Sequence, residues 1–313
     1  MKIVFMGTPE FAVPSLDILI KNHYNVVGVV TVPDKPAGRG QQIQESAVKK
    51  FAVANGIKVL QPLKLKDPVF ISELKNLNAD LQIVVAFRML PEEVWNMPRL
   101  GTYNLHGSLL PKYRGAAPIN WAIINGEKET GVTTFKLKHE IDTGNILFSQ
   151  KVSITDSMSV GELHDDLMKV GASLILKTVK AIESGHADLQ AQNDLEAVHA
   201  PKIFKETCKI DWNKTVDEIH NLIRGLSPYP GAFIEFKDSL GNVMSLKIIT
   251  AIKDKSEHSD TNGHLLTDNK TYANVVCKDG YICIKELQLQ GKKKMTTAEF
   301  LRGYKFPEGT VFA

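Results

Sequence analysis

The chain has 313 residues, of which 43% are hydrophobic and 23% are charged, and its formal net charge is +3. These proportions are typical of soluble globular proteins. The length exceeds what one hydrophobic core usually supports, so we predict two domains. A net charge this small does not by itself predict a nucleic-acid partner, and a basic surface would require local clustering of lysine and arginine.

The cysteines and the apolar runs indicate where in the cell the protein is found. Cys208, Cys277 and Cys283 form no Cys-x-x-Cys pair, which argues against a zinc ribbon or a thioredoxin-type site. Three free thiols fit a reducing compartment. The apolar run at residues 3–6 is too short for a signal-peptide core, and no run of about 18 apolar residues could span a membrane. We therefore expect a cytoplasmic protein without membrane association and, because no coiled-coil repeat is present, a monomer.

Strand-like and helix-like segments alternate over the first half of the chain. The strand-like segments are continuous apolar runs, which indicates a parallel sheet covered on both faces by helices. We predict a Rossmann-like, doubly wound α/β domain with a long helix at residues 160–182, capped by Ser157 or Ser159 and ended at Gly185. The predicted strands occupy residues 3–6, 25–32, 57–60, 81–87, 101–106, 133–137 and 145–153.

The pattern changes after a polar, irregular stretch. A short amphipathic helix is predicted at residues 216–226, followed by strand-like segments divided by glycines at residues 232–236, 243–252, 273–277 and 281–289. A small antiparallel β-barrel of the OB-like type is the simplest interpretation. We therefore predict a catalytic domain at residues 1–188, a linker at 189–208 and a β-barrel domain at 209–313.

Three polar residues are candidates for chemistry. Asn104 and His106 are two apart near the end of a predicted strand, so their side chains point the same way, at the edge where open α/β sheets bind ligands. Asp142 lies between the next two strands. Singly, each could be an ordinary loop or turn residue. Together they offer a hydrogen-bond donor, a polarising group and a proton acceptor.

The string Asn104-Leu-His106, Ser108-Leu-Leu-Pro111 and Arg114-Gly115, with Asp142-Thr-Gly144 downstream, resembles the active-site signature of the folate-dependent formyltransferases. The resemblance implies transfer of a formyl group from 10-formyltetrahydrofolate to an amine, without a metal. It assigns catalysis to Asn104, His106 and Asp142: the first two stabilise a tetrahedral intermediate and the third assists proton removal.

The same resemblance implies a folate pocket formed by two loops. Its residues are Ser108, Leu109, Leu110 and Pro111 from the signature, and Phe87, Arg88, Met89 and Leu90 after the strand at 81–87. The commoner family pattern in the second loop is Ala-Tyr-Gly, and Arg88 stands here in place of the glycine.

Other segments are similar to the tRNA-directed branch of that family. They are the Gly7-Thr8-Pro9 turn, the loop from Pro33 to Gly40, and the lysine run after Gly291. The resemblance implies that the amine is the α-amino group of methionine on initiator tRNA, contacted by Arg39, Lys292, Lys293 and Lys294. Two lysines that often follow the Arg39 position in the family are Gln41 and Gln42 here.

Purely structural interpretations of these segments also stay open. The Arg39 loop could be a plain surface loop, and Lys292 to Lys294 could form a solvated turn. Residues 208–313 contain 15 Lys and Arg against 13 Asp and Glu, so any tRNA face depends on uneven placement of charge.

Two alternative functions also remain. One is formyl transfer to a small amine, such as a nucleotide sugar or glycinamide ribonucleotide, which would need neither the Arg39 loop nor the barrel. The other is a nucleotide-binding module without chemistry, which fold alone does not exclude.

Overall fold

A computed structural model describes residues 1–37, 42–237 and 241–312. Arg39, the residue predicted to contact tRNA, lies outside the described residues. The chain forms two compact units that interleave along the sequence: Met1–Gly115, Thr130–Ser153 and His164–Ala200 form the first, and Ala116–Glu129, Ile154–Leu163 and Pro201–Ala313 form the second. The domain limits at 1–188, 189–208 and 209–313 stay a prediction. Among the described residues, no helix combines the length and apolar character needed to cross a membrane.

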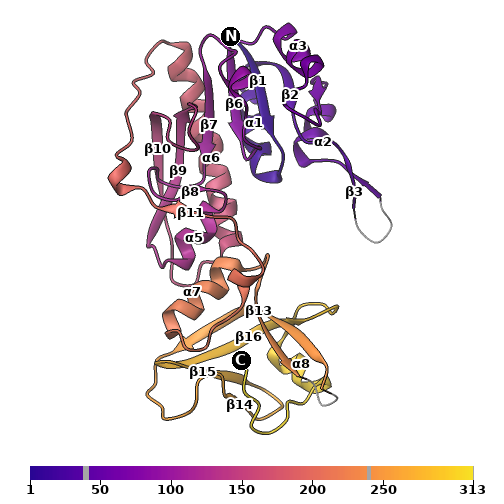
Figure 1. Ribbon diagram of the computed structural model, residues 1–313, viewed down its shortest axis with the longest axis vertical. Helices are drawn as coiled ribbons and strands as arrows, with labels where there is room; N and C mark the ends of the chain where they lie inside the picture. Colours follow the sequence, from indigo (N-terminus) through magenta and orange to yellow (C-terminus); the bar gives the residue numbers. More distant parts are fainter. Residues whose placement is uncertain (38–41, 238–240, 313) are drawn as a thin grey trace. The chain divides into compact units, whose positions relative to one another are not determined.

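The first unit is built on a seven-stranded sheet with the order β10-β9-β7-β6-β1-β2-β5 (Figure 1). Its central strands pair in parallel, and β9 pairs antiparallel to β7. The strands are β1 (Lys2–Gly7), β2 (Asn25–Val30), β5 (Val59–Leu60), β6 (Leu81–Val85), β7 (Thr102–His106), β9 (Glu129–Lys136) and β10 (Ile146–Ser153), and a separate ribbon joins β3 (Lys35–Ala37) to β4 (Gln42–Gln44).

Helices cover both faces of this sheet, which confirms the predicted Rossmann-like architecture. On one face, Val4 of β1 and Val84 of β6 share a core cluster with Phe70, Leu74 and Val94, which come from helices α3 and α4. On the other face, Leu105 of β7 is paired with Thr134, whose hydroxyl bonds Thr178 of helix α6 at 2.8 Å. The helices are α1 (Val13–Lys21), α2 (Ala47–Ala54), α3 (Pro68–Asn76), α4 (Glu92–Trp95) and α6 (Val160–Glu183), with a 3-10 turn η1 (Glu10–Ala12) before α1.

The ends of α6 follow the predicted signals. Of the two candidate caps, Ser159 is the one used: its hydroxyl accepts from the Glu162 N–H, and the Glu162 carboxylate accepts from the Ser159 N–H. This reciprocal pair satisfies two backbone groups at the start of the helix. Gly185, just beyond the helix, has a φ of +75°, a conformation in which glycine carries no side-chain penalty.

The second unit contains an antiparallel sheet in the order β12-β13-β16-β15-β14, with β17 paired to β16. Its longest strand, β13, shifts register between Ile248 and Ala251, and such bulges bend a strand and increase its twist. The predicted antiparallel barrel is confirmed as this curled sheet. Its elements are α5 (Pro118–Ile124), α7 (Val216–Leu226), β12 (Ala232–Lys237), β13 (Val243–Asp254), β14 (Leu265–Thr267), β15 (Ala273–Cys277), β16 (Gly280–Leu289), β17 (Met295–Thr296) and α8 (Thr297–Gly303).

An aromatic cluster fills the core of this curled sheet. Phe236 of β12 lies 5.6 Å from Phe306 and 5.9 Å from Phe312 between ring centroids, and Phe300 of α8 packs beside them. The sequence patterns did not predict β14 or α8. The start of α8 carries a capping box, Thr296 with Glu299, which was the available signal.

We predict that Gly263→Ala destabilises the second unit more than Gly291→Ala. Both glycines have positive φ, +83° and +76°, so alanine introduces similar backbone strain at each. A Cβ at Gly263 would lie 2.3 Å from the Phe312 carbonyl oxygen, whereas nothing lies within 4 Å of one at Gly291. Denaturant unfolding should show a further loss of about 1–3 kcal/mol for the first variant. Equal losses in both variants would contradict this packing.

Candidate active site

Strand β7 carries two of the three predicted catalytic residues. Asn104 and His106 alternate with Leu105, which faces α6, so both point to the sheet face covered by α3 and α4. His106 is only 6% exposed, and Asn104 is half-buried. Within the described part of the chain, the Asn104 amide has no hydrogen-bond partner of its own. An amide on this edge can therefore donate to a bound group.

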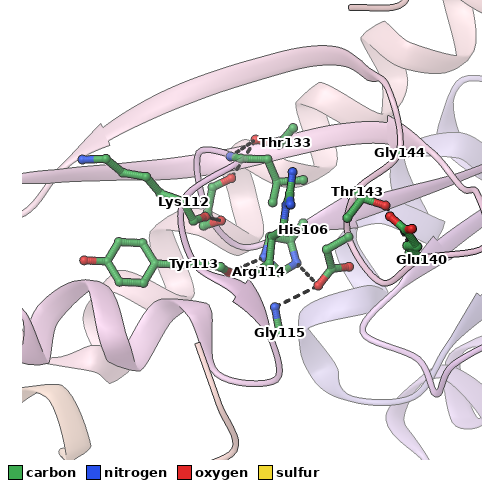
Figure 2. Close-up of polar contacts among 12 residues, drawn as sticks. His106, Lys112, Tyr113, Arg114, Gly115, Thr133, Glu140, Thr143 and Gly144 are labelled. Carbon is green, nitrogen blue, oxygen red and sulfur yellow. Dashed lines mark hydrogen bonds and ion pairs between the residues drawn. The ribbon is translucent and has the colours of Figure 1, made fainter. Parts of the chain in front are cut away.

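The His106 ring lies between a carbonyl and a carboxylate (Figure 2). Its Nε2 is 2.8 Å from the Tyr113 carbonyl oxygen, and its Nδ1 is 3.8 Å from Asp142 Oδ2. A carbonyl oxygen only accepts hydrogen bonds, so Nε2 carries a proton and donates it. Nδ1 is then the nitrogen that faces the Asp142 carboxylate.

The Asp142 carboxylate is held by a backbone donor. Its Oδ2 accepts the Gly115 N–H at 2.9 Å. Gly115 lies in the short strand β8 (Arg114–Gly115), which pairs with β11 (His199–Ala200), and a Cβ there would lie 2.6 Å from the Ala200 carbonyl oxygen. Only glycine permits this approach. Among the residues described, nothing hydrogen-bonds Oδ1, which leaves that oxygen able to take a proton.

The connection between β9 and β10 brings Asp142 to this position. Asp142 itself has a φ of +54°, and the Thr143 hydroxyl donates to the Glu140 carbonyl oxygen at 3.1 Å. A Cβ at Gly144 would lie 1.8 Å from the Lys136 carbonyl oxygen. The glycine of the Asp-Thr-Gly motif therefore lets the loop pack directly on the end of β9.

The Ser-Leu-Leu-Pro segment builds the loop that returns to His106. The Ser108 hydroxyl is fully buried and donates to the Lys112 carbonyl oxygen at 2.6 Å. Thr133 of β9 also holds this loop: its hydroxyl donates to the Ser108 carbonyl oxygen at 2.7 Å and accepts the Leu110 N–H at 3.2 Å. These bonds position the Tyr113 carbonyl. Folate contacts by Ser108, Leu109, Leu110 and Pro111 stay a prediction.

A pocket of about 500 Å³ opens beside the loop that follows β6. Its wall is largely apolar, with one amine, one carboxylate and one imidazole side chain. Met89 and Leu90 belong to the predicted folate residues, and the other lining residues had no signal in the sequence patterns. The pocket is lined by Leu65, Lys66, Met89, Leu90, Pro91, Glu92, Trp95 and His139.

Arg88, which replaces the usual glycine of the family, braces this loop. Its guanidinium donates to the carbonyl oxygens of Pro62 and Leu63, the latter at 3.0 Å, and lies 5.5 Å from the centroid of the Phe87 ring. Partial burial lowers the pKa of Arg88. Two of the Arg88 nitrogens thus donate hydrogen bonds within the protein. A folate contact by Phe87 or Arg88 stays a prediction.

Two family models match the chain. The family described as formyl transferase matches residues 1–179, and the one described as formyl transferase, C-terminal domain, matches residues 202–305. The chain is 55% identical to the methionyl-tRNA formyltransferase of Parabacteroides distasonis, covering 97% of this chain and 96% of that protein. It is 57% identical to the methionyl-tRNA formyltransferase of Phocaeicola vulgatus, with the same coverage of each.

A solved structure is also similar. WlaRD, a sugar 3N-formyl transferase crystallised in the presence of dTDP and 5-N-formyl-THF, matches with a TM-score of 0.68 and 25% identity. The match covers 94% of this chain and 99% of that one. With both family models matched and relatives more than half identical over nearly their full length, the chain belongs to the formyl transferase family.

Proposed function

We propose that this chain transfers the formyl group of 10-formyltetrahydrofolate to the α-amino group of methionine on initiator tRNA. The observation that carries the proposal is full-length identity above one half to relatives named methionyl-tRNA formyltransferase. The three free cysteines support a cytoplasmic setting. The convergence of His106 and Asp142 beside Asn104 supports the reaction type.

The site supplies each group that the reaction needs. The neutral amine attacks the formyl carbon, a C–N bond forms, and the carbonyl electron pair moves onto the oxygen. Asn104 and protonated Nδ1 of His106 donate hydrogen bonds to this oxyanion. Asp142 Oδ1 accepts the surplus proton of the attacking nitrogen. When the oxyanion collapses, the bond to the folate nitrogen breaks, and that nitrogen leaves with the proton that Asp142 took up.

The pocket beside Met89 suits the flat, aromatic part of a folate. Apolar and aromatic walls bury ring surface, and a few polar groups set its orientation. Trp95 offers an aromatic ring, and His139 and Glu92 offer polar groups. His139 lies three residues before Asp142, so this wall of the pocket belongs to the same loop as the proposed proton acceptor.

A surface of the second unit fits an RNA strand. We call Lys202, Phe204, Lys205, Tyr229 and Lys247 the aromatic–lysine surface. Tyr229 is 80% exposed and Phe204 is 57% exposed. The Lys247 amine lies 5.9 Å from the Tyr229 ring centroid, and the Lys202 amine lies 5.7 Å from that of Phe204. Exposed rings stack on bases, and amines beside them contact phosphates, so this surface supports a tRNA partner.

This surface is continuous across the strand pair. Lys205 lies 5.5 Å from the Phe233 ring centroid, and Phe233 of β12 is directly opposite Lys247 of β13. The predicted contacts Lys292, Lys293 and Lys294 are exposed in the turn at Gly291. This turn borders the surface, because Gln288, which is directly opposite Lys247, donates to the Lys292 carbonyl oxygen at 2.9 Å. Lys294 is 3.0 Å from the Glu286 carboxylate, and Lys205 is 3.6 Å from the Glu235 carboxylate, so one lysine of each group has part of its charge offset. We propose that the aromatic–lysine surface contributes more to tRNA binding than this turn, because it adds exposed rings that can stack on bases.

The proposed chemistry predicts that Asn104→Ala, His106→Ala and Asp142→Asn each lower kcat by about 10²–10⁴-fold, because each removes a donor or the proton acceptor. The measurement is formylation of charged initiator tRNA by purified protein with the folate donor. His186→Ala is the matched control, since His186 is exposed and lies away from the site.

Circular dichroism checks that each variant is folded. Formylation of a small amine such as a nucleotide sugar, with no activity on charged tRNA, would refute the proposed acceptor. An unchanged rate for Asp142→Asn would remove that residue as the proton acceptor.

The aromatic–lysine surface predicts that Tyr229→Ala raises the KM for charged tRNA by about 5–100-fold, since loss of one stacked base costs roughly 1–3 kcal/mol. Tyr272→Ala, which truncates a tyrosine 44% exposed on the same unit, serves as the control. Steady-state kinetics at several salt concentrations provide the test. The wild-type KM for tRNA should rise steeply with salt while the KM for folate changes little. Equal effects of the two tyrosine substitutions would contradict the assignment.

The pocket predicts that Met89→Ala raises the KM for the folate donor by about 5–50-fold, because an exposed apolar lining group loses contact with the ligand. Met89 is 68% exposed, so its truncation should leave stability nearly unchanged. Val69→Ala is the control, since Val69 is 69% exposed and does not line the pocket. A folate titration with each variant measures the effect, and an unaltered KM in Met89→Ala would place the folate elsewhere.

A further inference from the structure

We infer that Gln192 is a positioning residue that sets the orientation of Asp142; this rests on the proposed function. The nitrogen and the oxygen of the Gln192 side-chain amide contact different segments of the chain. Its Nε2 donates to the carbonyl oxygens of Asp142 at 2.9 Å and Gly144 at 2.7 Å. Its Oε1 accepts from Nε of Arg114 at 3.1 Å and from an Nη of the same residue at 2.7 Å. An amide has two N–H donors and two acceptor sites, so its hydrogen-bonding capacity is fully used.

Arg114 anchors this arrangement on the other side. It is 8% exposed, and one Nη also donates to the Asp194 carboxylate at 2.6 Å. The next residue, Gly115, donates its N–H to the Asp142 carboxylate. Strand β8 therefore reaches the Asp142 loop twice: directly through the Gly115 N–H (Figure 2), and through the Gln192 amide. One contact holds the carboxylate and the other holds the backbone that carries it.

The backbone at Asp142 needs such support. Its φ of +54° lies in the left-handed region, which costs a residue other than glycine roughly 1 kcal/mol. Carboxylate direction follows backbone direction, and proton transfer is sensitive to displacements of about 1 Å. Without the Gln192 amide, two carbonyl groups flanking Thr143 would lose their partner, and the Gly115 N–H would hold the carboxylate less firmly. The carboxylate would then sample orientations away from the reacting amine.

Gln192→Met tests this role, because methionine keeps the length of the side chain and removes both hydrogen-bonding groups. We expect kcat to fall by about 10–100-fold, with both KM values within about twofold of wild type. Gln190→Met is the matched control: the Gln190 side chain is exposed, and its backbone bonds to Ile146 survive the substitution. A loss in KM instead of kcat would overturn the inference.

A double-mutant cycle separates positioning from general damage. If Gln192 acts only through Asp142, Gln192→Met should cost less than about twofold in kcat once Asp142→Asn is present. The same loss in both backgrounds would show that Gln192 acts by another route and would refute the inference.

Hydrogen exchange gives a readout independent of activity. The Gly115 N–H should exchange about tenfold faster in Gln192→Met than in Gln190→Met, because its acceptor is less well held. Unchanged exchange would refute the positioning role even if kcat fell. If the wild-type chain failed to formylate charged tRNA, the proposed function would fall, while the exchange experiment would still decide whether Gln192 holds the Asp142 loop.

Discussion

The bond from the Gly115 N–H to the Asp142 carboxylate is the contact on which the rest of the site depends. It fixes one carboxylate oxygen beside His106 Nδ1, and the other oxygen has no hydrogen-bond partner among the described residues. In the mechanism that we propose, this carboxylate stabilises a charged imidazole and accepts a proton, and both tasks require a defined direction. The surrounding contacts can be understood as support for this one bond. The absence of a side chain at Gly115 lets β8 lie against β11, and the absence of one at Gly144 lets the loop pack on the end of β9.

Segments far apart in the chain meet at this point. Strand β7 supplies Asn104 and His106, the connection after β9 supplies Asp142, and a segment beyond α6 supplies Gln192. Strands β6 and β7 run parallel and end at a common edge, where their loops share the space beyond. Strand β9 runs antiparallel to β7 and ends opposite Tyr103, so the loop after it has to return to this edge to bring Asp142 to His106. The Ser108 loop then returns to the same edge and presents the Tyr113 carbonyl to His106. The chemistry we propose thus belongs to an edge of the sheet, which no single segment could form.

Local patterns predicted much of the architecture. Apolar runs identified β1, β6 and β7 because these strands are buried on both faces, and the three-to-four-residue period of α6 together with Ser159 and Gly185 identified that helix. The short strand β14 and helix α8 had weaker signals, since three residues show no period and a seven-residue helix is stabilised mainly by packing Phe300 and Leu301 into the core. The resemblance to formyltransferases, and not periodicity, pointed to Asp142.

What the sequence determined by itself is the alternation of strands and helices in the first half of the chain and the placing of Asn104 and His106 on one face of a strand. Both follow from the local spacing of side chains along the backbone. The tertiary structure alone decided the rest of the site. The 3.8 Å separation of His106 and Asp142, the bracing of the loop by Arg88 and the four bonds of Gln192 join residues distant in the chain. Such contacts have no local pattern, because folding brings these residues together only when the whole sheet forms.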